Sequence, residues 1–232
     1  MPAKDYNKKL YIILNTKNVV RGYIKKKFFY SNLVINKILY YFVKIFLKNK
    51  ITYWKNFEIK NKIEICHKFC SDFDNLWEKL KTNKKKIFLF KRNSEWLNWH
   101  LGNKVKNKEA FIVVKKSDNV ITGYAICVFK KIKELGIKKA VLVDLVSLED
   151  NTQSYLDLIL YSIKQSENHK CDLFEIVGFN ENKRKIIKII KPFEKKSKFS
   201  PFLFKCNNLN LNKILLKKEI WDPSEIDGDS IY

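Results

Sequence analysis

Residues 138 to 148, "KKAVLVDLVSL", are the stretch that most constrains the fold of this chain. After the two lysines, every residue except Asp144 and Ser147 is apolar. Such a nearly continuous apolar run is typical of a strand that is covered on both faces. A strand of this kind lies inside a sheet with helices over it. The sequence therefore predicts a layered α/β (α+β) domain with this strand near the middle of its sheet.

The segments next to this strand supply more of the predicted sheet. Residues 109 to 115 and 120 to 132 read as two strands joined by a polar turn at 116 to 119. A helix that begins near residue 151 and a strand at 172 to 179 follow the apolar strand. A strand–helix–strand unit after a hairpin predicts a mixed, mostly antiparallel sheet flanked by helices.

Further elements are expected on both sides of this unit. Before it, the patterns predict strands at 56 to 66 and 86 to 90, and helices capped by Ser71 and by Asn93, the second ending at Gly102. After it, they predict a helix at 180 to 193 and a strand at 200 to 207.

Residues 28 to 48 form the most apolar stretch of the chain. Charged residues interrupt it, so it lacks the roughly 20 apolar residues of a membrane span. If the stretch is a helix, its lysines lie on one face, at Lys37, Lys44 and Lys48. The apolar side chains of Leu39, Phe42 and Phe46 lie on the opposite side. The stretch is therefore predicted to be an amphipathic helix. It packs on a partner or on the chain itself, or lies in a membrane interface with its lysines toward anionic headgroups.

The chain is strongly basic, with 47 Lys and Arg against 24 Asp and Glu and a formal charge of +23. Arginine occurs only at Arg21, Arg92 and Arg184. Proteins that read nucleic acids favour the bidentate fork of arginine, so specific nucleic-acid binding is not expected. Attraction to an anionic membrane surface or to the phosphates of acyl-CoA remains compatible with this charge.

The cysteines and the first residues indicate a cytoplasmic protein without a metal. The five cysteines show no framework spacing, and Met1 to Lys9 do not read as a signal peptide. Cys66, His67 and Cys70 lie within one helical turn, but no second ligand pair follows, so no metal site is expected. The amphipathic helix adds the option of a peripheral position at the inner face of the membrane.

Taken in order, residues 86 to 205 resemble the GNAT superfamily of acyl-CoA N-acyltransferases. The resemblance rests on the hairpin "VITGYAICVF", the strand "AVLVDLVSL" with its helix, and the strand "LFEIVGFN". Two more stretches, "KRNSEWLNWHL" at 91 to 101 and "IWDPSEIDGDSIY" at 220 to 232, resemble the C-terminal GNAT-like domain of bacterial tandem proteins associated with cell-surface polysaccharide assembly. The resemblance implies a GNAT-like domain at 56 to 232. It also implies that residues 1 to 55 correspond to the tail and connecting helix of a first lobe.

The resemblance implies transfer of an acyl group from acyl-CoA, such as acetyl-CoA, to an amine or hydroxyl. The acceptor would be a small molecule or glycan, such as a sugar or a surface-glycan precursor. In this fold the CoA pyrophosphate meets backbone N–H groups in the turn after the central strand and at the N-terminus of the next helix. The resemblance thus assigns donor contacts to Leu145, Val146, Thr152, Gln153 and Ser154.

The turn that would hold this pyrophosphate contains no glycine. Gln153 matches the usual pattern, but no glycine follows it. Glu149, Asp150 and Asp157 bring negative charge to the place where phosphate would arrive. Two carboxylates at about 5–8 Å from a diphosphate would oppose its binding by a few kcal/mol. Capping of the helix by Asn151 or Thr152 is the alternative use of these residues.

Two side chains are the candidates for catalysis. Asp144, in the central strand, could act as a general base through water, and Tyr124 could protonate the leaving thiolate. Asp144 could equally accept structural hydrogen bonds, and Tyr124 could be a core aromatic residue. The glycine-free turn leaves a second function open. The chain would then be a non-catalytic GNAT-like module, a binding or scaffolding half that meets a partner lobe, a second copy or a membrane surface through residues 28 to 48.

Overall fold

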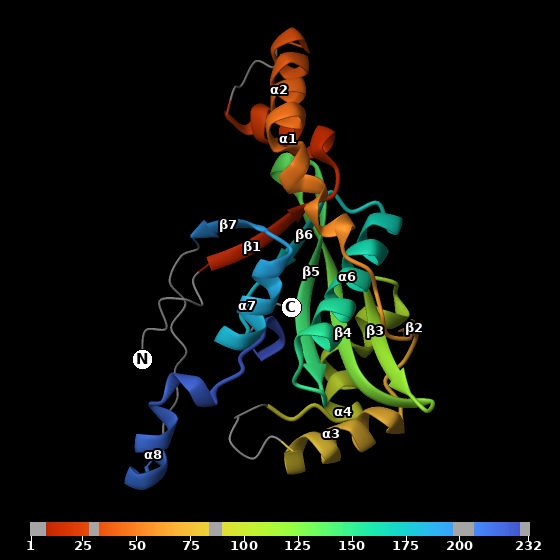
Figure 1. Ribbon diagram of the computed structural model, residues 1–232, viewed down its shortest axis with the longest axis vertical. Helices are drawn as coiled ribbons and strands as arrows, with labels where there is room; N and C mark the ends of the chain where they lie inside the picture. Colours follow the sequence, from red (N-terminus) through yellow and green to blue (C-terminus); the bar gives the residue numbers. More distant parts are fainter. Residues whose placement is uncertain (1–7, 28–32, 84–89, 197–206, 228–232) are drawn as a thin grey trace.

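A computed structural model describes residues 8–27, 33–83, 90–196 and 207–227 (Figure 1). Its centre is a seven-stranded sheet in the order β2-β3-β4-β5-β6-β1-β7. The strands are β1 (Lys8–Ile13), β2 (Ile63–Cys66), β3 (Ala110–Ser117), β4 (Val120–Ile132), β5 (Ile137–Ser147), β6 (Leu173–Ile176) and β7 (Phe193–Lys196). All neighbours pair antiparallel except β5 and β6, which are parallel. The predicted fold class is confirmed, with β5 in the middle of the sheet.

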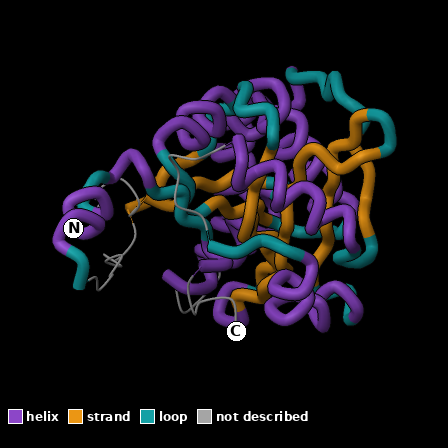
Figure 2. The backbone as a smooth tube through the Cα atoms, turned by 90° about the horizontal axis from the view of Figure 1, so that it is seen from below, coloured by secondary structure: helices purple, strands orange, loops and turns teal. Residues whose placement is uncertain are grey.

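Helices lie on both sides of this sheet (Figure 2). The α-helices are α1 (Thr16–Lys27), α2 (Leu33–Thr52), α3 (Ser71–Asn83), α4 (Ser94–Leu97), α5 (Asn103–Lys106), α6 (Thr152–Asn168), α7 (Glu181–Ile189) and α8 (Leu209–Leu215). Shorter helical turns are η2 (Tyr53–Asn56), η3 (Asn98–Gly102), η4 (Lys133–Leu135), η5 (Lys218–Ile220) and η6 (Glu225–Asp227). One core joins α6 and α7 to the sheet, and a second core joins α3, α4 and η6 to the opposite face.

Strand β5 shows why its sequence is almost entirely apolar. Ala140 and Leu142 pack into the core under α6, whereas Val141 and Val143 pack into the core under α3. All four side chains are fully buried. A strand with a helix layer on each side must be apolar at consecutive positions, and this is the pattern that predicted it.

The helix caps agree with the sequence only in part. Asn93 caps α4, since its side chain accepts a hydrogen bond from the Trp96 N–H. The prediction that this helix ends at Gly102 is wrong, because helical backbone continues through a π-helical turn and α5 to Lys106. The strand expected at 56 to 66 is limited to β2. The strands expected at 86 to 90 and 200 to 207 fall largely outside the described residues.

The segment before residue 56 contributes a strand that the sequence pattern did not predict. Strand β1 lies between β6 and β7, and Leu10 and Ile12 belong to the core under α6. Helices α1 and α2 then extend beyond one end of the sheet (Figure 1). In the described part of the chain, no helix is long and apolar enough to cross a bilayer.

Replacing Leu10 by alanine tests whether β1 is an integral strand. Leu10 is fully buried, so Leu10→Ala should lower the free energy of unfolding by about 2–5 kcal/mol, measured by urea denaturation. Lys8→Ala, on a partly exposed position of the same strand, should change it by about 0.5 kcal/mol or less. Equal, small effects of both changes would contradict the placement of β1.

Candidate functional site

The direction of the Asp144 side chain is set by an irregularity in β5. In the pairing of β4 with β5, Ile126 lies opposite Asp144 and Cys127 lies opposite Leu142, so Val143 is an extra residue. Such a bulge moves the residues after it to the other face of the sheet. Regular alternation would place Asp144 under α6 with Leu142. The bulge instead turns it toward Tyr124 and the α3–α4 side.

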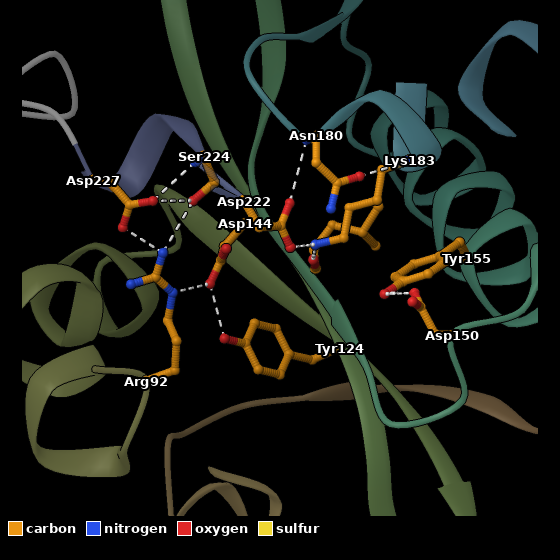
Figure 3. A network of polar contacts seen from close by, with 11 residues as sticks. Arg92, Tyr124, Asp144, Asp150, Tyr155, Asn180, Lys183, Asp222, Ser224 and Asp227 are labelled. Carbon is orange, nitrogen blue, oxygen red and sulfur yellow. Dashed lines mark hydrogen bonds and ion pairs between the residues drawn. The ribbon is translucent and has the colours of Figure 1, made fainter. Parts of the chain in front are cut away.

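Asp144 lies there in a buried polar network (Figure 3). Its Oδ2 accepts hydrogen bonds from Arg92 Nε and from the Tyr124 hydroxyl, both at 2.8 Å. The Arg92 guanidinium also forms an ion pair with Asp227 and donates to Ser224 Oγ at 3.2 Å. The Arg92 side chain is completely inaccessible, and Trp96 of α4 covers it, with 4.8 Å between the guanidinium carbon and the ring centroid.

The charges in this network shift the pKa values of its members. Burial and the Asp144 carboxylate raise the pKa of Tyr124 well above its ordinary value, so its hydroxyl stays protonated and donates. Burial alone would lower the pKa of Arg92, but Asp144 and Asp227 outweigh it and raise that pKa. Burial raises the pKa of Asp227, and Arg92 offsets part of this effect. One guanidinium thus holds two buried carboxylates.

A second buried ion pair lies on the other side of the same strand end. Lys183 of α7 contacts Asp222 Oδ2 at 2.6 Å and also donates to the backbone carbonyl of Leu145 in β5. The side chain of Asn180 caps α7, and its backbone N–H donates to Asp222 Oδ1 at 3.3 Å. The backbone acceptor at the end of β5 is therefore occupied by a side chain of the protein itself.

The two ion pairs hold a C-terminal segment, residues 222 to 227, against the ends of β5 and β6. The parallel pairing of these strands covers only residues 139–142 and 173–176. Beyond it, Phe179 N–H donates to the Pro223 carbonyl at 2.6 Å, and Gly178 forms an antiparallel bridge with Ser224. Open α/β sheets bind ligands in the crevice outside the carboxyl ends of parallel strands. Here the C-terminal segment lies in that crevice.

Close packing in the crevice depends on a glycine. Gly178 has φ +83, in the left-handed region that favours glycine. A Cβ atom at this position would lie 3.1 Å from the Pro223 carbonyl oxygen. The glycine thus allows the C-terminal segment to approach the end of β6.

The turn between β5 and α6 is closed by its own side chains. Asn151 Oδ1 accepts a hydrogen bond from Ser154 N–H at 2.8 Å, so Asn151 caps α6. Glu149 Oε2 accepts from Lys115 Nζ at 2.8 Å and from Ser154 Oγ at 2.9 Å. Hydrogen bonds from Lys115 and Ser154 lower the pKa of Glu149, so a negative charge stays at this turn.

The structure places the sequence-predicted donor contacts in different environments. Leu145, Val146 and Ser154 are buried, and Ser154 bonds to Glu149. Gln153 donates to Asp157 Oδ1 at 2.6 Å. Thr152, the first residue of α6, is exposed. The candidate catalytic residues Asp144 and Tyr124 contact each other, but each is about 2% exposed or less.

Sequence reasoning missed the role of the residues that organise this site, which are Arg92, Lys183, Asp222, Ser224 and Asp227. Four of them lie in the two stretches, 91 to 101 and 220 to 232, that carry part of the sequence resemblance, but nothing in the sequence indicates that the two stretches meet. Lys183 lies outside both stretches and has no signal among so many lysines. Among the described residues, no group of three or more His, Cys, Asp and Glu side chains could hold a metal ion.

Comparison with known proteins identifies similar solved structures at low sequence identity. No protein-family model and no curated protein matches the chain. A predicted acetyltransferase from Clostridium acetobutylicum, solved with acetyl-CoA, is 11% identical and covers 62% of this chain and 96% of its own, with a TM-score of 0.48. A GNAT family acetyltransferase from Staphylococcus aureus is 15% identical and covers 61% of this chain and 98% of its own, with a TM-score of 0.44.

A third similar structure is an aminoglycoside acetyltransferase from an uncultured soil metagenomic sample, in complex with trehalose. It is 15% identical and covers 63% of this chain and 96% of its own, with a TM-score of 0.46. Likenesses at this level leave the activity of the chain to be argued from its own residues.

Replacing Arg92 by methionine should destabilise the protein strongly. The change leaves Asp144 and Asp227 buried without their cation, and removing one partner of a buried pair costs about 3–5 kcal/mol. Urea denaturation measures this loss. Combining Arg92→Met with Asp144→Asn and Asp227→Asn should recover much of it, because no uncompensated charge remains. If the triple variant does not regain stability, Arg92 stabilises the fold by the packing of its side chain and not by its charge.

The raised pKa of Asp227 predicts a pH dependence. A carboxyl whose pKa is higher in the folded state stabilises the fold fully below its unfolded pKa of about 3.9. That contribution is lost as the pH rises through the folded pKa. The free energy of unfolding of the wild type minus that of Asp227→Asn should therefore fall as the pH rises above about 4. Urea denaturation across this range measures the difference, and an increase with pH would contradict the assignment.

Proposed function

We propose that this chain is a GNAT-like module that functions by binding a partner or a surface, and that its own C-terminal segment closes the acyl-donor crevice. The observation that carries the proposal is Lys183, which bridges the Leu145 carbonyl and Asp222. Lys183 thus occupies the backbone acceptor at the end of β5 and also holds the C-terminal segment through Asp222.

Opening the crevice would be costly. The C-terminal segment leaves only when Asp222 separates from Lys183 and Asp227 separates from Arg92, and both pairs are buried. Removing one partner of a buried pair costs about 3–5 kcal/mol because the other charge stays buried. When the segment moves away, both charges of a pair reach water, so the cost of opening is smaller than this. Any cost of opening weakens acyl-CoA binding, by about a factor of ten for each 1.4 kcal/mol.

The turn that would receive the pyrophosphate supports the same proposal. The Asn151 side chain already accepts the Ser154 N–H, one of the donors that a phosphate would use. Lys115 is paired with Glu149 and in contact with Ser154. Asp150 accepts the Tyr155 hydroxyl at 3.0 Å, which keeps a second carboxylate at the turn. The local charge therefore opposes an anionic donor.

The second candidate function is the acyltransferase that the sequence resemblance implies. It would transfer an acyl group from acyl-CoA to an amine or hydroxyl, with a sugar or surface-glycan precursor as the proposed acceptor. The observation that favours it is Ser147, at the end of β5. Its buried Oγ has no hydrogen-bond partner among the residues that the structure describes. In this reading Asp144 is the base and Tyr124 the acid once the C-terminal segment has moved away.

Calorimetric titration with acetyl-CoA separates the two candidates. We expect no saturable heat from the full chain at moderate salt, because the crevice is filled and the turn is negative. Lys183→Met combined with Asp222→Asn frees the Leu145 carbonyl and removes one of the two anchors of the C-terminal segment, without changing the net charge. The matched control is Lys185→Met with Glu181→Gln, which removes an exposed ion pair from the same helix.

Micromolar binding by the unmodified chain that persists at moderate salt would contradict the proposed binding function. Binding that appears in Lys183→Met/Asp222→Asn alone, together with acyl transfer to an amine, would support the acyltransferase. Absence of binding in all three proteins is the result that the first candidate predicts.

A further inference from the structure

We propose that α2 and the basic pocket at its C-terminal end form a docking surface for an anionic phospholipid membrane. The inference rests on the proposed binding role but not on the closed crevice. Acetyl-CoA binding by the full chain would therefore contradict the closed crevice and not the membrane surface. Absence of vesicle binding, in the experiment described below, would contradict the membrane surface and not the closed crevice.

One side of α2 is apolar and exposed. Ile38, Tyr41, Phe42 and Ile45 are 62%, 57%, 57% and 71% exposed, and we call these four residues the α2 apolar face. Their spacing of three, four and seven residues places them on one side of a helix. Large apolar side chains exposed together on one helix face mark an interaction site.

The chain segment that carries this face is strongly basic, although Glu134 and Glu167 pair with its Lys26 and Lys55. Between Asp5 and Glu58 the sequence has no acidic residue, yet it contains twelve Lys and Arg. Lys37, Lys44 and Lys48 are exposed along α2 beside its apolar face. Figure 1 shows α1 and α2 beyond the end of the sheet, away from α3 and α8. An apolar helix face bordered by lysines is the pattern of helices that lie in the interface of anionic membranes.

A pocket of about 550 Å³ continues this surface toward the body of the protein. Its lining includes Asn49, Lys50 and Tyr53 from the end of α2 and η2, and Lys188, Lys191 and Glu194 from α7 and β7. Asn49 follows Ile45 by about one helical turn, so this lining residue of the pocket lies on the same side of α2 as the apolar face. Lys188 pairs with Glu194 at 3.7 Å, which leaves Lys50 and Lys191, placed over the rings of Phe193 and Tyr53, to meet a phosphate group.

Lys191 occupies this pocket at a conformational cost. It follows α7 with φ 51, in the left-handed region where glycine is usual at the end of a helix. Its Nζ lies 4.0 Å from the centroid of the Tyr53 ring. Lys108 and Lys170 adopt the same left-handed conformation just after α5 and α6, so this backbone conformation is a helix end of the kind this chain uses repeatedly. What is particular to Lys191 is the position of its ammonium group over Tyr53 at the pocket.

A phospholipid surface is the ligand that uses all of these features. Headgroup phosphates would meet the lysines, and the upper acyl region would receive the α2 apolar face. A soluble phosphate would need only the pocket, and a nucleic acid would need only the lysines. The adjacency of the apolar face and the pocket therefore favours the membrane.

Vesicle flotation with the full chain tests the proposal. We expect binding to phosphatidylcholine vesicles that contain phosphatidylglycerol, little binding to phosphatidylcholine alone, and weakening by salt. Ile38→Asn with Ile45→Asn should reduce binding by about tenfold or more, because two apolar side chains no longer enter the interface. The matched control is Leu211→Asn with Ile214→Asn, two partly exposed apolar residues of α8 at the other end of the molecule.

Lys191→Gly tests the pocket without harming the fold. The change relieves the left-handed backbone, so the thermal midpoint should not fall, while vesicle binding should weaken by about fivefold. Lys79→Gln on α3, at the far end of the molecule, should leave binding nearly unchanged.

Three results would overturn the proposal. The first is no binding to phosphatidylglycerol vesicles. The second is vesicle binding by the Ile38→Asn/Ile45→Asn variant that equals that of the unmodified chain, together with DNA binding as tight as vesicle binding. This result would indicate a surface that binds any polyanion. The third is complete release of the protein from vesicles by soluble glycerol phosphate, which would place the ligand in solution.

Discussion

The buried guanidinium of Arg92 is the interaction on which the arrangement of this molecule depends. It joins the start of α4, the centre of β5 through Asp144, and the C-terminal segment through Asp227 and Ser224. Asp144 and Asp227 lie 52 and 135 residues from Arg92 in the sequence. Because a buried charge must be paired, the position of one of them constrains the others.

The same constraint connects the fold to the proposed function. The bulge at Val143 turns Asp144 toward Arg92, and Arg92 fixes the C-terminal segment over the end of β5. On the other side of the strand end, Lys183 donates a hydrogen bond to the backbone carbonyl of Leu145. A sheet of this kind would normally offer this crevice to a ligand. In this chain the C-terminal segment fills it, whereas exposed apolar side chains and lysines lie together on α2.

Most of the sheet could be predicted from the sequence, because its patterns are local. The apolar run of β5, the hairpin before it and the asparagine before α6 each act within a few residues. The apolar residues of strand β1, KKLYII, favour a strand, but its place in the sheet could not be predicted, because it comes only from pairing with β6, where Leu10 and Ile176 lie 166 residues apart. The register shift at Val143 has no sequence signature. The partners of Asp144 therefore follow only from the three-dimensional arrangement.

Amide hydrogen exchange of the intact chain tests the central claim most directly. If residues 222 to 227 are part of the interior, the N–H groups of Phe179 and Ser224 should be protected to nearly the same degree as those of β5, since both are hydrogen-bonded to this segment. Exchange of these amides at the rate of an unfolded chain, while β5 stays protected, would contradict it. The end of β5 would then be open in solution and accessible to a ligand.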